Sequence, residues 1–527
     1  MLDRRLAGVL LHPTSFPGRF GIGDLGPECL RFLDWAREAG LGWWQVLPLG
    51  PTSYGDSPYQ CFSAFAGNPM LVSPEALVAD GLARQTDLMC PPFPTDRIDY
   101  GWVIHWKTEF LRGVYTRFAA DKPERHVKAY SAWQKRKDIQ VWLEDYALFR
   151  VCKDLHEGRS WLEWDVKLRT RNEKALEKVR KEHAANIEFH KFSQYLFAIQ
   201  WERIRRAAAD RNIRIIGDAP IYVALDSADT WANQHFFQLD KKGIPTAVAG
   251  VPPDYFSATG QLWGNPLYNW EAMKADGYEW WVQRLQSIFA LVDLVRLDHF
   301  RGFMGYWAVP WGAPTAEKGK WIKGPGADFF TAIKKKFKNL PIIAEDLGEI
   351  TPDVVEVRDK FNLPGMKILQ FAWGVAQDAP LVADPGHEFH PHNHTPNSIV
   401  YTGTHDNDTT LGWWRTASDR ERRFLQVYLA TDGNVAHWDL IRSAFMSVSK
   451  TAIIPMQDFL GLGSEARINL PGRAEGNWAW RYHPDQLSWD LARHIRNLTL
   501  IYQRCATPPE TALPRIDPTK ANYLEGQ

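Results

Sequence analysis

Several common features are missing from this chain of 527 residues, and each absence excludes a class of function. Charge of one sign is not in excess, because 62 basic residues balance 62 acidic ones. A nucleic-acid surface needs a basic excess to neutralise phosphates, so we expect no nucleic-acid partner. No apolar run approaches the roughly 20 residues of a membrane helix, so we expect no membrane association. The five cysteines are widely spaced and form no Cys-x-x-Cys pair, which argues against a disulfide framework or a zinc site.

The N-terminus lacks the apolar core of a signal peptide. A basic pair precedes a few apolar residues in MLDRRLAGVLLHPTSFPG, but Pro13 ends that run early. Together with the cysteine pattern, this predicts a cytoplasmic protein. The sequence leaves the oligomeric state open and is compatible with a monomer.

Motifs for cofactors are absent or incomplete. The chain contains neither a GxxxxGK[ST] phosphate loop nor a GxSxG elbow. GIGDLG at 21–26 has the glycine spacing of a dinucleotide site, but the next strand ends in Pro-Leu-Gly at 48–50, where an acidic residue is needed. HEFHPHNH at 387–394 is not a His-Glu-x-x-His motif, and its proline and asparagine content indicates a loop. We therefore predict no cofactor and no metal.

Tryptophan is abundant, with 25 residues. Most of these side chains are expected in the core. Aromatic faces also stack on the apolar faces of sugar rings, so the surplus favours a carbohydrate ligand.

Short apolar runs recur along the chain and alternate, in its later part, with helix-like stretches. This pattern is typical of a parallel sheet that is buried on both faces. Eight such runs predict an α/β fold, the (β/α)8 TIM barrel. The runs cover residues 7–11, 43–49, 213–220, 291–298, 340–346, 366–373, 398–406 and 451–458.

The second and third runs are about 160 residues apart, far more than the dozen or so that a crossover needs. Apolar residues at three- and four-residue spacing within 139–146 and 192–199 indicate helices in this interval. We therefore predict a barrel from residues 1–53 and 213–527, with large, mainly helical insertions. Residues 54–212 form the main inserted region.

Acidic residues stand at the carboxyl ends of several predicted strands. These ends meet on one face of a parallel barrel, where active sites lie. The alternative is that each carboxylate caps the helix that follows it. The residues are Asp218, Asp298, Glu345, Asp406 and Asp458.

Paired carboxyl groups are what cleavage of a glycosidic bond requires, one to protonate the leaving oxygen and one to attack or stabilise the sugar carbon. Asp298 ends a strand, and Arg296 lies two residues earlier, on the same side of that strand. Arg296 could hold Asp298 ionised as a nucleophile, although a purely structural ion pair fits the same spacing.

Two further carboxylates have features of catalytic groups. Burial and the neighbouring Asp346 would raise the pKa of Glu345, as a general acid needs, unless Glu345 only caps a helix. Asp406, next to His405, could bind the hydroxyls of a distorted sugar ring, unless it only closes an Asx-turn.

The order Arg-x-Asp, Glu, His-Asp on the fourth, fifth and seventh strands resembles the α-amylase superfamily of retaining glycosidases. VRLDHFRGF, IIAEDLG and YTGTHDNDTTLGWW resemble the 4-α-glucanotransferases, which include amylomaltase and the plant disproportionating enzyme. Segments 53–69, 215–224 and 249–268 are similar to the same family, and the resemblance extends from LLHPTSFPG to segment 456–472.

The resemblance implies that Asp298 is the nucleophile, Glu345 the acid/base and Asp406 the stabiliser of the transition state. It also implies that the barrel has no C-terminal β-sandwich and no structural calcium, since only a short, partly helical stretch follows the eighth strand. The residues that it places around the glucan are Arg296, His299, His405, Asp218, Tyr59, Asp254, Trp263 and Asn265, with Tyr54 on a second glucan-binding surface.

We therefore expect a retaining 4-α-glucanotransferase that forms a covalent glycosyl-enzyme. It would move α-1,4-glucan segments from a glucan donor to glucose or a maltooligosaccharide, and could also form cyclic glucans. Segment 249–268, rich in Gly, Pro and aromatic residues, has the composition of a lid that would exclude water. The alternatives are an α-glucan hydrolase with the same carboxylates and an inactive glucan-binding protein.

Overall fold

Eight parallel strands form the centre of the computed structural model, which describes residues 4–253, 257–374, 386–473 and 475–508. The strand order is β10-β11-β12-β1-β2-β3-β6-β9. The open edge is bridged where the Ala344 N–H donates to the Pro364 carbonyl at 2.9 Å. The predicted (β/α)8 barrel is therefore confirmed, and each predicted run overlaps one strand. The strands are β1 (Leu6–Leu10), β2 (Trp43–Gln45), β3 (Arg214–Pro220), β6 (Leu294–Asp298), β9 (Ile342–Ala344), β10 (Gly365–Ile368), β11 (Ser398–Tyr401) and β12 (Thr451–Pro455).

Successive residues of these strands belong to two different cores. Ile343 and Ile453 pack with the side chains inside the barrel, whereas Ala344 and Ile454 pack against the surrounding helices. Both faces are apolar because both are buried, which is why the strands read as continuous apolar runs. A polar side chain an even number of residues from an inward-facing one on the same strand therefore also points into the barrel.

Helices cover the outer face of the barrel. α1 contacts both α9 and α19, so the first and last parts of the chain meet there. Outside the β2–β3 connection, the helices are α1 (Pro27–Glu38), α10 (Ala228–Ala232), α11 (Trp270–Ala275), α12 (Glu279–Leu291), α13 (Ala327–Lys336), α14 (Pro352–Lys360), α15 (Thr410–Thr416), α16 (Asp419–Leu429), α17 (Ala436–Met446), α18 (Met456–Phe459) and α19 (Trp489–Ile501).

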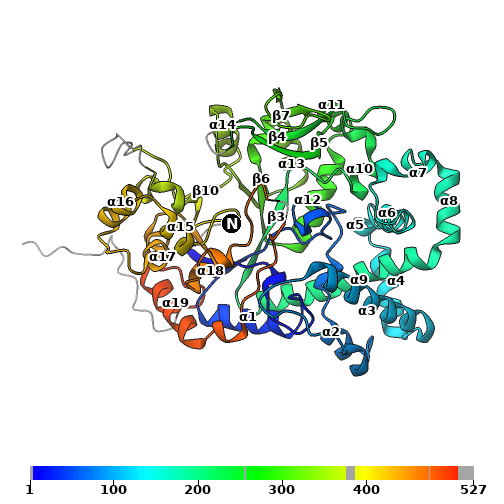
Figure 1. The fold of residues 1–527 in the computed structure, drawn as a ribbon, viewed down its shortest axis with the longest axis horizontal. Helices are drawn as coiled ribbons and strands as arrows, with labels where there is room; N and C mark the ends of the chain where they lie inside the picture. Colours follow the sequence, from blue (N-terminus) through cyan, green and yellow to red (C-terminus); the bar gives the residue numbers. More distant parts are fainter. Residues whose placement is uncertain (1–3, 254–256, 375–385, 474, 509–527) are drawn as a thin grey trace, which may run out of the picture.

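The long connection between β2 and β3 is mainly helical, and Figure 1 shows it beside the barrel. The apolar spacing of 139–146 spans α5 and the start of α6, because Trp142 has non-helical backbone angles and separates the two. The division of the chain into a barrel and an inserted region, 54–212, stays a prediction. The helices here are α2 (Pro74–Ala79), α3 (Tyr100–Asp121), α4 (Glu124–Gln134), α5 (Lys137–Gln140), α6 (Leu143–Leu155), α7 (Val166–Arg169), α8 (Glu173–Glu182) and α9 (Ala184–Ala209).

A second, antiparallel sheet has the order β5-β4-β7-β8, and the sequence analysis did not identify it. The connection after β3 supplies β4 (Ala247–Val251) and β5 (Gln261–Pro266), and the one after β6 supplies β7 (Gly305–Pro310) and β8 (Lys320–Lys323). β4 and β5 belong to the segment predicted as a lid. Because both connections leave the carboxyl ends of barrel strands, the sheet lies near the face that carries the acidic residues (Figure 1).

The described residues after β12 form α18, α19, two short 3-10 helices (Ser464–Ala466 and Pro484–Gln486) and loops. No helix among the described residues is long and apolar enough to cross a membrane.

Candidate active site

A buried arginine joins two carboxylates on neighbouring strands. Leu294 of β6 lies inside the barrel, so Arg296 and Asp298, two and four residues later on the same strand, also point inward. Arg296 binds both oxygens of Asp218 on β3, at 2.8 and 3.0 Å, and its Nη2 lies 2.8 Å from Asp298 Oδ1. The spacing in the sequence predicted the Arg296–Asp298 contact, but not that Asp218 shares the guanidinium.

Burial shapes the charges of this cluster. Burial raises the pKa of Asp218, and the Arg296 guanidinium opposes that rise while the Asp298 carboxylate adds to it. Burial alone would lower the pKa of Arg296, but Asp218 and Asp298 together raise it well above its usual value. Arg296 is therefore a permanent cation inside the barrel.

Glu345 follows β9 and contacts the residue next to Asp298. Its Oε2 accepts the His299 N–H at 2.7 Å, and its Oε1 accepts the Leu347 N–H at 3.2 Å. His299 has a left-handed backbone (φ 52°), which turns the chain sharply just after Asp298. Burial raises the pKa of Glu345 to about 8, with further contributions from Asp298 and, to a smaller extent, Asp346; Arg296 opposes the rise.

The structure confirms Asp346 as a charge that raises the pKa of Glu345, but it adds a larger contribution from Asp298. The sequence analysis named Asp346 as the neighbouring charge, but Asp346 binds Arg358 at 2.6 Å and accepts the Met366 N–H at 2.8 Å. Those partners hold the Asp346 carboxylate toward β10, so Asp298 is the more important neighbour of Glu345.

Asp406 lies in the loop after β11, with its side chain 46% exposed. Its Oδ1 accepts a hydrogen bond from Asn469 Nδ2 at 2.6 Å, and its Oδ2 lies 3.3 Å from His405 Nε2. Arg467 Nη2 donates to the Asp406 backbone carbonyl at 2.6 Å. The sequence analysis identified neither Arg467 nor Asn469.

Aromatic rings line the site between Asp218 and Asp406. The Tyr59 hydroxyl donates to Asp218 Oδ2 at 2.9 Å, and its ring stacks on His405 with centroids 4.9 Å apart. Trp478, which the sequence analysis did not identify, lies 5.8 Å from the Tyr59 ring and 6.0 Å from that of His405. Burial lowers the pKa of His405, so this imidazole is neutral near pH 7.

His299 packs edge-on against Trp263 of β5, with ring centroids 4.8 Å apart. Burial lowers the pKa of His299 to about 4, so it too is neutral near pH 7. Trp263 Nε1 donates to Gln261 Oε1 at 3.2 Å. The Asn265 amide donates to the Val223 carbonyl at 2.8 Å, which directs it toward the protein wall. The second sheet thus brings Trp263 against the residue next to Asp298.

Two predicted residues are not part of this cluster in the described structure. Tyr54 is 62% exposed, and its ring lies 5.5 Å from Lys153 Nζ of α6. Asp254 lies outside the described residues.

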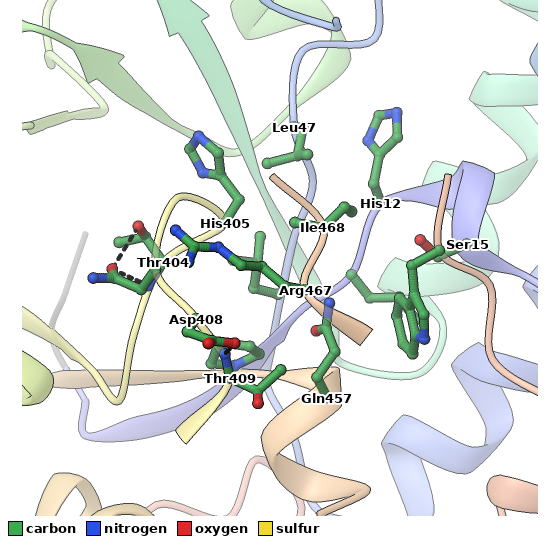
Figure 2. A pocket seen from close by; sticks show the side chains of 15 residues that line it. His12, Ser15, Leu47, Thr404, His405, Asp408, Thr409, Gln457, Arg467 and Ile468 are labelled. Atoms are coloured by element: carbon green, nitrogen blue, oxygen red, sulfur yellow. Dashed lines mark hydrogen bonds between the residues drawn. The ribbon is translucent and has the colours of Figure 1, made fainter. Parts of the chain in front are cut away.

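Two cavities adjoin the cluster. The first is open to solvent, has a volume of about 440 Å³ and is lined by His405, Arg467 and residues from β1 and β12 (Figure 2). Burial lowers the pKa of His12 in its wall to about 3. The second is also open to solvent and has a volume of about 690 Å³, and Tyr59 and Asp218 form part of its lining. Among the described residues, no group of three or more His, Cys, Asp or Glu is arranged to hold a metal.

Comparison with known proteins agrees with this geometry. The family model described as 4-alpha-glucanotransferase matches residues 11–488. A 4-alpha-glucanotransferase of Thermus thermophilus is 48% identical over 508 residues, which cover 95% of this chain and 99% of the relative. The chloroplastic/amyloplastic 4-alpha-glucanotransferase of Solanum tuberosum is 44% identical, covering 95% of this chain and 87% of the relative.

A solved structure, the amylomaltase from Streptococcus agalactiae in complex with acarbose, has a TM-score of 0.91 and 36% identity. The match covers 95% of this chain and 100% of that chain. The chain therefore belongs to the 4-alpha-glucanotransferase family, enzymes that transfer glucan chains.

Proposed function

We propose that the chain transfers α-1,4-glucan segments by double displacement, with Asp298 as nucleophile, Glu345 as acid/base and Asp406 as stabiliser of the transition state. The observation that carries this proposal is the contrast between two neighbouring carboxyl groups. Asp298 is paired with a permanent cation, Arg296, whereas Glu345 is buried and has a pKa of about 8. The ion pair with Arg296 suits Asp298 to the part of nucleophile, and Glu345 keeps its proton near neutral pH and suits the part of acid, as a retaining mechanism requires.

In the first step, Asp298 attacks the anomeric carbon while Glu345 gives its proton to the leaving oxygen. Arg296 holds Asp298 Oδ1, so Oδ2 is the oxygen that attacks. Asp406 and the neutral His405 bind hydroxyls of the distorted ring, and these bonds strengthen as charge develops at the anomeric carbon. Tyr59 and Asp218 flank the donor sugar.

In the second step, Glu345 takes a proton from the acceptor hydroxyl, which attacks the glycosyl-enzyme and restores the α configuration. Transfer requires the acceptor sugar to outcompete water. Trp263 and Asn265, carried by the second sheet, form part of the wall that positions the acceptor and limits water. Asp254 is proposed for the same groove on the resemblance alone, and Tyr54 for a separate glucan-binding surface.

The donor is an α-1,4-glucan, and the acceptor is glucose or a maltooligosaccharide. Incubation with maltotriose should give glucose together with oligomers longer than the substrate. A rise in reducing ends without longer products would replace transfer by hydrolysis. Asp298→Asn should remove both products, and wild-type turnover by that variant would refute the assignment of the nucleophile.

A further inference from the structure

Asp406 lies at the end of a strand, in a loop, and its side chain is half-exposed. Within that loop, the Asp406 backbone N–H donates to Thr404 Oγ1 at 3.2 Å. The neighbouring His405 side chain lies beside the Asp406 carboxylate, with Nε2 3.3 Å from Oδ2. Asp298 and Asp218, in contrast, are both held by Arg296. A carboxylate that must meet one transition-state geometry needs a fixed partner from a rigid neighbour.

That partner comes from the chain after β12. Asn469 is 8% exposed, and its Nδ2 donates to Asp406 Oδ1 at 2.6 Å. Arg467 ties the two loops together, because Nη2 donates to the Asp406 carbonyl at 2.6 Å while Nε donates to the Asn469 carbonyl at 2.7 Å. Figure 2 shows the Arg467 side chain extending across the cavity toward the loop that carries Thr404 and His405.

The segment that carries Asn469 is itself held by a backbone hydrogen bond. The Trp478 N–H donates to the Ile468 carbonyl at 2.6 Å, although Trp478 has a left-handed backbone (φ 63°) that is unfavourable for a bulky side chain. The Trp478 carbonyl accepts the Tyr100 hydroxyl of α3 at 2.9 Å, which helps to hold this conformation. The helical connection after β2 thereby supports the segment that holds Asp406.

We propose that Asn469, oriented by Arg467, is a positioning residue for Asp406 in the transfer reaction. An amide donor suits this task, because it fixes one carboxylate oxygen without supplying a positive charge that would compete with the oxocarbenium-like sugar. Oδ2, next to His405, is then left to bind sugar hydroxyls. The inference rests on the role proposed above for Asp406 and adds what holds that residue in place.

The sharpest test is the isosteric change Asn469→Asp. Two ionised carboxylates about 2.6 Å apart repel each other strongly, so at high pH the new group is unfavourable beside Asp406. At low pH the new carboxyl is protonated and can donate the hydrogen bond that the amide made. The other polar groups around Asp406 (His405, Arg467 and the Tyr59 phenol) are the same in variant and wild type, so the ratio of their rates isolates this change.

We would measure kcat and KM for maltotriose disproportionation from pH 5 to pH 8, with thermal unfolding as a check on folding. Asn469→Ala should lower kcat about 10- to 100-fold, the usual loss for a hydrogen bond to a charged group, with KM within about threefold. Its rate relative to wild type should not change with pH. The rate of Asn469→Asp relative to wild type should rise about tenfold or more from pH 8 to pH 5.

Asn434 offers a matched control, because its Nδ2 donates to Asp432 Oδ2 at 2.7 Å in an exposed loop. Asn434→Asp makes the same chemical change away from the site and should keep wild-type rates at every pH. Asn469→Ala with wild-type kcat, or with a raised KM alone, would overturn the proposal. So would a rate of Asn469→Asp, relative to wild type, that does not change between pH 5 and pH 8.

Asp406→Asn, measured in parallel, distinguishes the role proposed for Asp406 from the positioning role proposed for Asn469. If Asp406→Asn is inactive and the Asn469 variants behave like wild type, only the positioning role fails. If Asp406→Asn itself keeps full activity, the role proposed for Asp406 fails first.

Discussion

Replacing Glu345 by glutamine should make the protein more stable at high pH, while it removes activity. The Glu345 carboxyl is buried beside Asp298, and its pKa is raised from 4.5 to about 8. In the folded state it therefore binds a proton more tightly than in the unfolded chain. Its contribution to stability is largest below pH 4.5 and falls as the pH rises toward 8, because the folded protein must then either keep the proton or bury a charge.

The size of this effect follows from the two pKa values. Linkage gives a cost of about 3 kcal/mol at pH 7 and nearly 5 kcal/mol at pH 9, and almost none at pH 4. A glutamine cannot ionise, so it avoids that cost. Both Glu345 oxygens accept backbone N–H groups, so the glutamine NH₂ loses one of those bonds at every pH, at about 1–2 kcal/mol. The signature is the change with pH rather than the offset at any one pH.

Thermal unfolding measures that signature. For a chain of this length, about 1 kcal/mol corresponds to roughly 1 °C in Tm. The Tm of Glu345→Gln minus that of wild type should therefore increase by about 4 °C between pH 4 and pH 9. Glu349→Gln provides the control, because it makes the same chemical change at a side chain that is 75% exposed and leaves the buried Glu345 carboxyl in place. A Tm difference for Glu345→Gln that stays constant from pH 4 to pH 9 would refute the raised pKa and, with it, the assignment of the acid.

Other perturbations have equally direct outcomes. Activity of the wild-type enzyme should fall above about pH 8, as Glu345 loses its proton. A plot of kcat/KM against pH checks this, and a loss of activity that already sets in near pH 6 as the pH rises would contradict it. Arg296→Lys cannot hold Asp218 and Asp298 together, so kcat should fall by about 10³-fold; a loss under tenfold would count against the shared cation. Tyr59→Phe keeps the stack on His405 and loses the bond to Asp218, so kcat should fall about tenfold, measured on maltotriose. Arg504 is fully buried and donates to backbone carbonyls of Phe445, Ser447 and Ser449, so Arg504→Lys should lower Tm by about 2–4 °C with little change in kcat at 25 °C.

The barrel could be predicted because its strands are buried on both faces. Ile343 and Ile453 face inward while their neighbours face the helices, so the whole strand is apolar and visible in the sequence. The second sheet was not predicted. β5 contains Gly264 and Pro266, and β8 is mostly exposed, so neither has a clear alternation of apolar and polar residues. Those strands are defined by their partners in the sheet more than by their own sequence.

The same distinction applies to the site. The Arg296–Asp298 contact follows from two-residue spacing on one strand, which any strand would show. Asp218 joins them because β3 and β6 pair with Asp218 opposite Arg296, a register that only the closed barrel fixes. Asn469 is 63 positions from Asp406 and stands in a loop, so no periodic pattern connects the two. Contacts along an element are therefore predictable here, and contacts between loops require the fold.

In the double displacement proposed above, the environment of Asp298 and Glu345 would also let Glu345 act first as the acid and then as the base. Before attack, the Asp298 charge helps to keep the proton on Glu345. When Asp298 becomes an ester in the glycosyl-enzyme, that charge disappears, while Arg296, which lowers the pKa of Glu345, remains. The pKa of Glu345 must then fall, so that, in the proposed mechanism, the acid of the first step becomes the base that takes a proton from the acceptor. The reversal needs no movement of the protein, because formation and loss of one covalent bond switch the neighbouring charge off and on.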